Sequence, residues 1–326
     1  MKLLKLVPDN TNIDFVRLRG WAFGLTLLLS VLAIGLTVAK GLNFGVDFEG
    51  GLMIEERFAT PPDHDRVREI VAAQNVGEAS LQTFGDPRTV TIRLPVQQGG
   101  DEGATNAAVR KVESALGRAF PGAEFRRYST VSGKVSGELI RNGILAVVLA
   151  VLGIGLFAII RFEWQFGVST VAAIVHDLLM TLGFFALTQF EFDLNIVAAV
   201  LTIIGYSIND KIVIDDRIRE NMRRYRKMDM REIVNLSVNE TLPRTVMTSV
   251  TILLALFALL FLGGHVLRGF TAAMILGIVV GTYSSIYVSS SLLISLGLRA
   301  EPEGVRPERK GIEGAERIAP RTPRAE

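Results

Sequence analysis

Uncharged apolar runs recur along this chain, and several of them approach the roughly 20 residues that a helix needs to cross a membrane. Length and lack of charge predict spans at residues 20–39, 142–160, 166–189, 194–214, 245–264 and 270–298. The first run is too long for the core of a signal peptide, so we expect a retained anchor. The pattern therefore predicts a polytopic α-helical membrane protein with six transmembrane helices, residues 142–298 forming the bundle of the last five.

Between the first two runs, residues 40–141 have the patterning of a soluble domain. Strand-like stretches at 51–58, 81–84, 89–94 and 124–130 alternate with helical periodicity at 63–74 and 104–120. The order strand, helix, strand, strand, helix, strand predicts an external, ferredoxin-like α+β domain with two helices on one face of its sheet. The uncovered face either packs on a partner domain or binds another polypeptide. Residues 131–138 are rich in small residues and predict a hinge or an ordinary loop.

Basic residues indicate how the chain is oriented. Lys2, Lys5, Arg17 and Arg19 precede the first span, and eight Lys and Arg residues lie between 211 and 231. By the positive-inside rule, the N-terminal residues 1–19 and the tail 299–326 are cytoplasmic. Residues 215–244 show helical apolar spacing on a basic background, which predicts an amphipathic helix on the anionic inner leaflet, although positive-inside topology alone also explains the charge. Low apolar content predicts that the tail is disordered.

Composition narrows the possible chemistry. The 326 residues are 49% hydrophobic with a net charge of +2 and a mean hydropathy of +0.36. Cysteine is absent, which excludes disulfides and zinc–thiolate sites, and the three histidines are scattered. There is no spacing typical of a nucleophile and its base, of a phosphate loop or of metal ligands. We therefore expect no enzyme activity, no metal, no cofactor and no nucleic-acid partner.

The candidate site centres on Asp210, near the end of the run 194–214. An ionisable residue within a membrane span is a functional hypothesis by default. Arg244 precedes the next run and lies at the same end if the two helices are antiparallel neighbours. An aspartate facing an arginine that can approach or withdraw is able to bind and release a proton, so the pair predicts a proton relay; a static ion pair is the alternative. Polar residues expected to support the pair are Tyr206, Asn209 and Thr248, with Thr202 and Ser207 on the same stripe.

A second polar pair, His176 and Asp177, lies near the middle of the third predicted span. Adjacent residues on a helix do not face one another, so we expect each to have its own partner. Structural hydrogen bonding and a proton relay both remain open. In the last span, the glycines between 269 and 281 and the serines between 284 and 291 predict close helix packing and no further role.

Several motifs, in this order, resemble the SecF family of bacterial protein-export subunits over residues 14–298. They are Phe44-Gly45-Val46-Asp47-Phe48-Glu49-Gly50-Gly51, Arg161-Phe162-Glu163-Trp164, His176-Asp177, Gly205-Tyr206-Ser207-Ile208-Asn209-Asp210, Asp216-Arg217-Ile218-Arg219-Glu220-Asn221 and Ser284-Ser285-Ile286-Tyr287-Val288. The combination is highly specific, whereas any single motif is weak.

The resemblance implies a half-transporter of the resistance-nodulation-division superfamily in the bacterial inner membrane, with both termini cytoplasmic and the external domain periplasmic. Its implied partners are SecD, the SecYEG translocon, a YajC-like accessory subunit and exported preproteins. With SecD it would use the proton-motive force to promote late steps of export. Asp210 and Arg244 match the family's proton-linked residues.

Two other functions stay open: half of a proton-driven small-molecule or lipid exporter of the same superfamily, and a non-transporting scaffold of the export channel. The chain departs from the family's pattern at Lys211, where a small residue is common, and at Asp215 beside Asp216. A cation next to Asp210 raises the question of whether its field alters that residue's titration.

Overall fold

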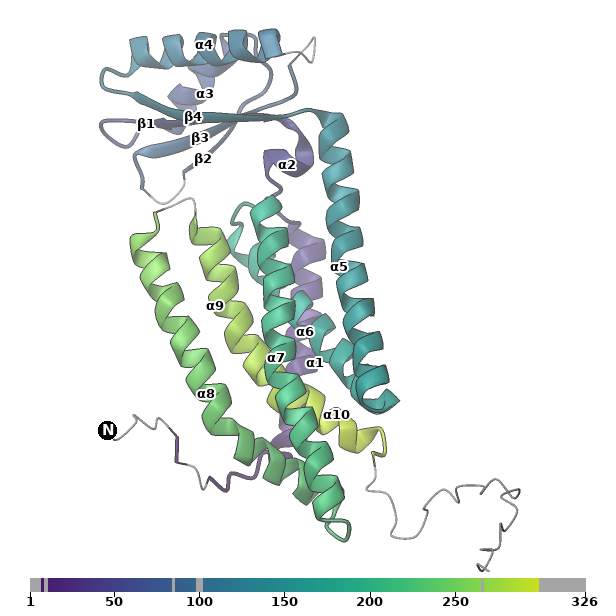
Figure 1. The fold of residues 1–326 in the computed structure, drawn as a ribbon. Coiled ribbons are helices and arrows are strands. Elements are labelled where there is room, and N and C mark those ends of the chain that lie inside the picture. Colours follow the sequence, from purple (N-terminus) through teal and green to yellow (C-terminus); the bar gives the residue numbers. More distant parts are fainter. Residues whose placement is uncertain (1–6, 9–10, 84–85, 98–101, 265–266, 299–326) are drawn as a thin grey trace, which may run out of the picture.

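The computed structural model describes residues 7–8, 11–83, 86–97, 102–264 and 267–298, in which a helical bundle lies beside a small α/β domain (Figure 1). Within these residues, six helices are long and apolar enough to cross a membrane, as predicted. They are α1 (Arg19–Lys40), α5 (Gly133–Arg161), α6 (Trp164–Thr188), α7 (Leu194–Arg224), α8 (Met230–Leu262) and α9 (Arg268–Tyr283), the last continuing through η3 (Ser284–Ser289) into α10 (Ser290–Ser295). The tail 299–326, predicted to be disordered, lies outside the described residues.

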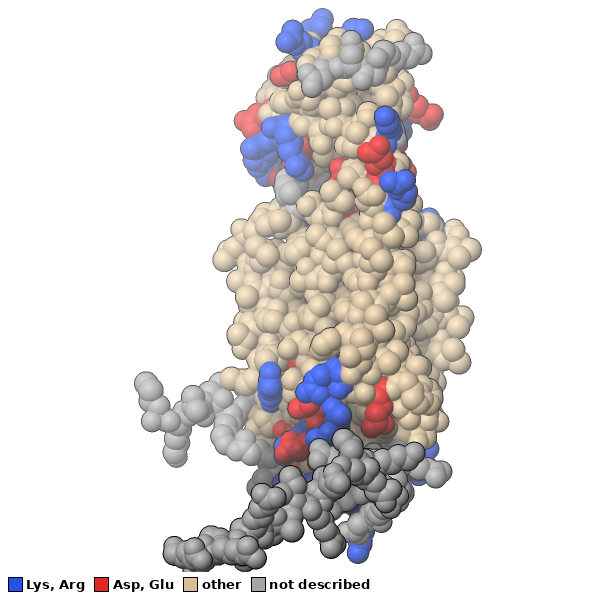
Figure 2. Space-filling model, turned by 45° about the vertical axis from the view of Figure 1, so that its right-hand side comes forward, with Lys and Arg blue, Asp and Glu red and all other residues tan. Residues whose placement is uncertain are grey.

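The surface of the bundle fits a membrane. On the face that Figure 2 shows, charged side chains gather at the two ends and leave an uncharged belt between them. Large apolar side chains project from α1 and α5 within the spanning stretches; Leu27, for example, is 67% exposed and Leu152 is 62% exposed. In water such exposure would be costly, but hydrocarbon chains of a bilayer accept it.

The α/β domain is an antiparallel sheet under two helices. Its strands are β1 (Gly51–Arg57), β2 (Ser80–Thr83), β3 (Thr89–Leu94) and β4 (Glu124–Val131), in the spatial order β2-β3-β1-β4. The helices α3 (His64–Ala72) and α4 (Glu102–Ala119) cover one face (Figure 1). Alternate residues of β1, Leu52 and Ile54, are buried against Val112 and Leu116 of α4. The ferredoxin-like prediction is confirmed.

The other face of the sheet is turned toward the bundle. Met53, Glu55 and Arg127 on this face line a polar cavity of about 210 Å³ together with Asp193 and Phe270 from the outer ends of the bundle. The face that the two helices leave uncovered is therefore turned toward the bundle of the same chain across this cavity. The outer ends of the helices are those next to the domain; the inner ends are those opposite to it.

Two short connections join the domain to the bundle. The first includes a helix that was not predicted, α2 (Val46–Glu49), which leads into Gly50 and Gly51. Gly51 has a φ of +112°, and a Cβ there would lie 2.4 Å from the Leu94 carbonyl oxygen, so both its conformation and its surroundings require glycine. The second connection is not the predicted loop at 131–138: β4 ends at Val131, Ser132 caps the next helix, and α5 begins at Gly133.

The prediction of an amphipathic helix on the inner leaflet at 215–244 is wrong. Helix α7 continues to Arg224, a short turn follows, and α8 begins at Met230 and runs through Pro243 into the fifth span. The apolar residues Ile218, Met222 and Ile233 are buried in a core between the inner ends of the helices. Because the two long helices bury these three side chains against each other, these residues do not form a face for lipid.

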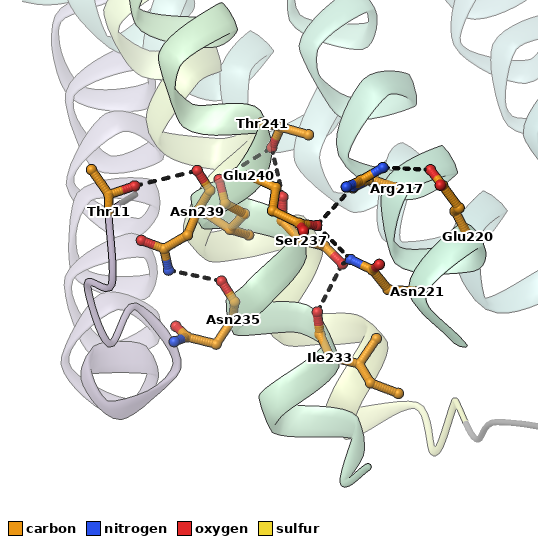
Figure 3. Close-up of polar contacts among 11 residues, drawn as sticks. Thr11, Arg217, Glu220, Asn221, Ile233, Asn235, Ser237, Asn239, Glu240 and Thr241 are labelled. Carbon is orange, nitrogen blue, oxygen red and sulfur yellow. Dashed lines mark hydrogen bonds and ion pairs between the residues drawn. The ribbon is translucent and has the colours of Figure 1, made fainter. Parts of the chain in front are cut away.

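Polar contacts also hold these inner ends together (Figure 3). Thr11 Oγ1 donates to the Asn239 carbonyl at 3.3 Å, a contact that Figure 3 shows. Asn239 also donates from Nδ2 to the Ile13 carbonyl at 2.8 Å and accepts from the Ile13 amide at 2.8 Å, which fixes the segment before α1 on α8. Glu240 accepts from Arg217 Nε and Asn221 Nδ2, both at 2.7 Å, which joins α7 to α8.

Candidate functional site

Asp210 is buried within α7 at 2% exposure, and its Oδ2 atom has no hydrogen-bond partner among the described residues. Arg244, on the neighbouring α8, is exposed. Its charge attracts the Asp210 carboxylate, yet the described residues show no ion pair between them within 4.0 Å. The two packed helices thus bring the predicted pair near each other, but the two side chains do not form an ion pair. A buried carboxylate with a free oxygen and a cation at a distance has the elements that proton uptake and release require.

Some of the predicted supporting residues lie between the helices, and others are exposed on the outside of the bundle. Tyr206 Oη lies 3.1 Å from Ser249 Oγ, which lies 3.0 Å from Thr282 Oγ1, so hydroxyls connect α7, α8 and α9. Asn209 and Thr202, by contrast, are exposed on the outside of the bundle. Thr248 donates to the carbonyls of Arg244 and Thr245 on its own helix. The stripe therefore does not form one continuous path to Asp210.

Asp177 joins three helical segments in the interior. Its Oδ2 atom accepts hydrogen bonds from Ser207 Oγ at 2.6 Å and Ser284 Oγ at 2.9 Å, which links α6 to α7 and η3. Its Oδ1 atom lies 3.0 Å from His176 Nδ1. The expectation that the two adjacent side chains do not face one another is therefore wrong, whereas the expectation that Asp177 has partners of its own is confirmed by Ser207 and Ser284. With both oxygens engaged, Asp177 has the geometry of a structural acceptor.

The serines of the last span do more than allow close packing. The packing itself is present: a Cβ at Gly277 would lie 2.4 Å from Ile203. However, Ser284–Ser289 forms a π-helical turn, a feature often found at functional sites, and two of its hydroxyls bind charged groups on other helices. The run of serines in the sequence was a signal for polar contacts here. The 3.6-residue periodicity of an α-helix could not predict which way they point, because a π-helix has a different spacing.

Lys211 turns away from Asp210, its neighbour in the sequence. Its Nζ atom lies 2.9 Å from Asp215 Oδ2 on the next turn of α7 and donates to Ser169 Oγ of α6 at 3.1 Å. It also donates to Ser289 Oγ of η3. The Lys211 and Asp215 side chains are 3% and 2% exposed, so the ion pair is buried between three helical segments.

No group of three or more His, Cys, Asp or Glu residues able to hold a metal ion occurs within the part of the chain that the structure describes. The polar side chains described above at the centre of the bundle are carboxylates, one lysine, one histidine and hydroxyls. Such groups carry protons and hydrogen bonds.

Two family descriptions match the chain. Residues 111–299 match the family "Protein export membrane protein SecD/SecF, C-terminal", and residues 35–61 match the "SecD/SecF GG Motif", which includes Gly50 and Gly51. The second match falls on the segment where the structure requires glycine.

Curated relatives extend the likeness over nearly the whole chain. The protein translocase subunit SecF of Cereibacter sphaeroides is 43% identical over 301 residues, covering 90% of this chain and 93% of that protein. The protein of the same name from Rhodobacter capsulatus is 41% identical over 319 residues, covering 94% and 96%.

Two solved structures resemble the fold. SecDF, a translocon-associated membrane protein from Thermus thermophilus, matches with a TM-score of 0.82 and 37% identity over 90% of this chain. SecDF in a super-membrane-facing form matches with a TM-score of 0.65, 35% identity and 88% of this chain covered. The present chain spans about 40% of the first solved SecDF chain and 39% of the second.

Proposed function

Because the chain belongs to the SecF family of protein translocase subunits, we propose that it is an auxiliary subunit of the Sec translocase which, with SecD, uses the proton-motive force to promote late steps of preprotein export through SecYEG. The observation that carries this proposal is the buried Asp210 carboxylate, with one oxygen unpartnered among the described residues and Arg244 nearby. A unit charge that crosses the membrane releases about 2.3 kcal/mol per 100 mV, which is enough to bias a change of helix packing.

The arrangement of α7 supports coupling to the external domain. Asp193 caps this helix by accepting from the Ile196 amide at 3.1 Å, and Asp47 of α2 accepts from the Leu194 amide at 3.0 Å. The helix that carries Asp210 therefore contacts, at its outer end, the segment that leads into β1. A shift of α7 upon protonation of Asp210 would be transmitted directly to the domain.

The exposed polar residues of α7 support SecD as the partner. Asn209 and Thr202 lie on the outside of a membrane-spanning stretch, where a polar side chain requires protein or water as its neighbour. In the solved SecDF chains, of which this chain spans about 40%, additional polypeptide is present. We propose that a SecD subunit covers this surface, and that SecYEG, a YajC-like subunit and preproteins are the further partners.

The proposed location is the bacterial inner membrane, with the α/β domain periplasmic and both termini in the cytoplasm. Basic residues at the inner ends of the bundle, including Arg219, Arg223 and Arg224, support this orientation through the positive-inside rule. The role is that of a translocation subunit and not of an enzyme.

Export of a model preprotein into inverted membrane vesicles, with and without a proton gradient, tests the proposal. Vesicles would contain SecD with this chain, its Asp210→Asn variant or its Asp216→Asn variant, at equal membrane abundance. Asp216 is the matched control, since it is an exposed aspartate on the same helix. Loss of the gradient-dependent increment with Asp210→Asn alone is the expected result. An unchanged increment would contradict proton coupling and favour the scaffold.

The small-molecule or lipid exporter makes a different prediction in the same vesicles. If the chain were half of such an exporter, the gradient would drive uptake of an apolar dye, and preprotein export would not depend on Asp210. The GG-motif match and the SecF relatives support protein export instead.

A further inference from the structure

The buried ion pair of Lys211 and Asp215 lies on α7 beside Asp210 and is not among the residues of the proposed proton relay. Burial of two charges is costly unless each is matched in charge and hydrogen bonding. Lys211 has three N–H donors, and the structure supplies three acceptor residues: Asp215, Ser169 and Ser289. The ammonium group is therefore fully satisfied.

The partners come from three segments. Asp215 lies one turn along α7 from Lys211, Ser169 belongs to α6, and Ser289 is the last residue of the π-helical turn η3. The ammonium thus cross-links three segments of the bundle. The same three segments meet a second time at Asp177, which accepts from Ser207 and Ser284.

The opposite charges of Lys211 and Asp215 also balance each other. Lys211 Nζ lies 2.9 Å from Asp215 Oδ2, and the described residues show no ion pair within 4.0 Å between Lys211 and its sequence neighbour Asp210. The other faces around Lys211 present the hydroxyls of α6 and η3. On the side of Asp210, the acting charge is that of Arg244 on α8. These two carboxylates of α7 thus have different cations as neighbours.

We propose that Lys211 and Asp215 are a positioning pair, which fixes α7 against α6 and the π-helical turn. Because Asp215 neutralises Lys211, the pair also leaves the charge of Asp210 free to change without interference from the adjacent lysine. The part that concerns Asp210 rests on the proposed function. The positioning part does not, since it depends only on packing and charge.

A double-mutant cycle tests the positioning part. Lys211→Gln leaves the Asp215 carboxylate buried and unmatched, Asp215→Asn leaves the ammonium unmatched, and the double variant removes both charges while keeping hydrogen-bonding groups. We expect each single variant to lower the yield of folded, detergent-extracted protein by about tenfold, and the double variant to recover it to within about twofold. Asp216→Asn is the matched control, since that aspartate is exposed and lies next to Asp215.

If neither single variant yields folded protein, recovery in the double variant still decides the matter, because only mutual neutralisation explains it. A double variant no better than the poorer single variant would overturn the proposal, as would single variants that behave like Asp216→Asn.

The claim that Asp215 shields Asp210 from the charge of Lys211 needs a measurement that a loss of packing alone does not change. The pH at which half of the gradient-dependent export increment is lost should be the same for the native chain and the double variant. For the Asp215→Asn protein that does fold, it should move to lower pH by about one unit, since the unmatched Lys211 cation then favours the charged form of Asp210. An equal shift in the double variant would overturn this part.

If Asp210→Asn itself leaves the increment unchanged, the proposed function fails, and the yields of the double-mutant cycle still decide whether the pair positions the helices.

Discussion

Ser207 donates a 2.6 Å hydrogen bond to Asp177 and so ties α7 to α6 three residues before Asp210. Ser284 of the π-helical turn donates to the same oxygen at 2.9 Å. Together with the Lys211 cross-link, this contact holds α7 on both sides of the candidate proton-relay residue. Asp210, whose Oδ2 atom has no hydrogen-bond partner among the described residues, thus lies on an anchored helix, and the anchoring residues are separable from it by mutation.

We expect Asp177→Asn to lower the free energy of unfolding by about 1.5–3 kcal/mol, because the serines lose a charged acceptor in the interior. The gradient-dependent increment of export at equal abundance should be retained. SDS titration of the purified protein and the vesicle assay are the two measurements. Ser207→Ala, which removes one donor and leaves Asp177 with Ser284 and His176, is the control and should cost less. Loss of the increment with unchanged stability would instead place Asp177 on the proton path.

Arg93 of β3 fastens the domain to the bundle. It pairs with Glu191 at 3.1 Å, where both side chains are mostly buried, and donates to Asn43 Oδ1 and the Phe44 carbonyl. We expect Arg93→Gln to reduce stability by about 1–3 kcal/mol and to increase the mobility of the domain. Burial raises the pKa of Glu191, and the Arg93 cation opposes this effect.

The distance between a spin label on α4 and one at the outer end of α8 would measure that mobility, and a broader distribution is expected. Arg88→Gln is the control, because Arg88 pairs with Asp86 on the exposed surface and such pairs contribute less than about 1 kcal/mol. Equal distributions for the two variants would show that the Arg93 contacts do not fix the domain.

Gly51→Ala should be among the most damaging single substitutions in the domain. The φ of +112° is unfavourable for alanine, and the new Cβ would lie 2.4 Å from the Leu94 carbonyl oxygen. We expect a loss of more than about 2 kcal/mol, measured by SDS titration. Gly117→Ala in α4 is the control, since a Cβ there meets nothing within 4 Å and should stabilise the helix by about 0.5–1 kcal/mol. Similar effects of the two variants would contradict the steric argument.

The sequence predicted most of the helices and strands but not the contacts between them. Period-two and period-3.6 apolar spacing gave β1 and α4, and uncharged length gave the six spans, because burial imposes those patterns locally. The same spacing led to the wrong prediction that Ile218 and Ile233 face lipid. An apolar face predicts burial but does not say whether lipid or another helix covers it.

The candidate site was predictable only in part. Asp210 and Asp177 stood out because charges are rare in spans. The partnership of Lys211 with Asp215 was not predicted, although their i, i+4 spacing on one helix was a signal for it. Ser284 and Ser289 could not be assigned to charged partners, since their positions depend on a π-helical turn that local periodicity does not reveal.

The buried Glu56 should make the stability of the α/β domain depend on pH in an unusual way. The side chain is 1% exposed, and its Oε2 atom has no hydrogen-bond partner among the described residues. Burial, with a smaller effect from Glu113 on α4, raises its pKa from 4.5 to about 7. The folded domain therefore holds a proton that the unfolded chain has released between these values. Its contribution to stability is full below about pH 4.5 and is lost as the pH rises through about 7.

Glu56→Gln should remove this dependence and stabilise the domain at pH 8 relative to the native chain, by at most roughly 3 kcal/mol, while the two proteins converge near pH 5. Since the chain lacks cysteine, Val112→Cys in the buried core of the domain allows the opening rate to be followed by thiol labelling of the intact protein. A cysteine at the exposed Ser114 corrects for the thiol's own titration. Glu113→Gln, which removes the smaller cause, should give a smaller gain at pH 8. A gain from Glu56→Gln that is equal at pH 5 and pH 8 would show that this carboxyl group does not titrate between the two states.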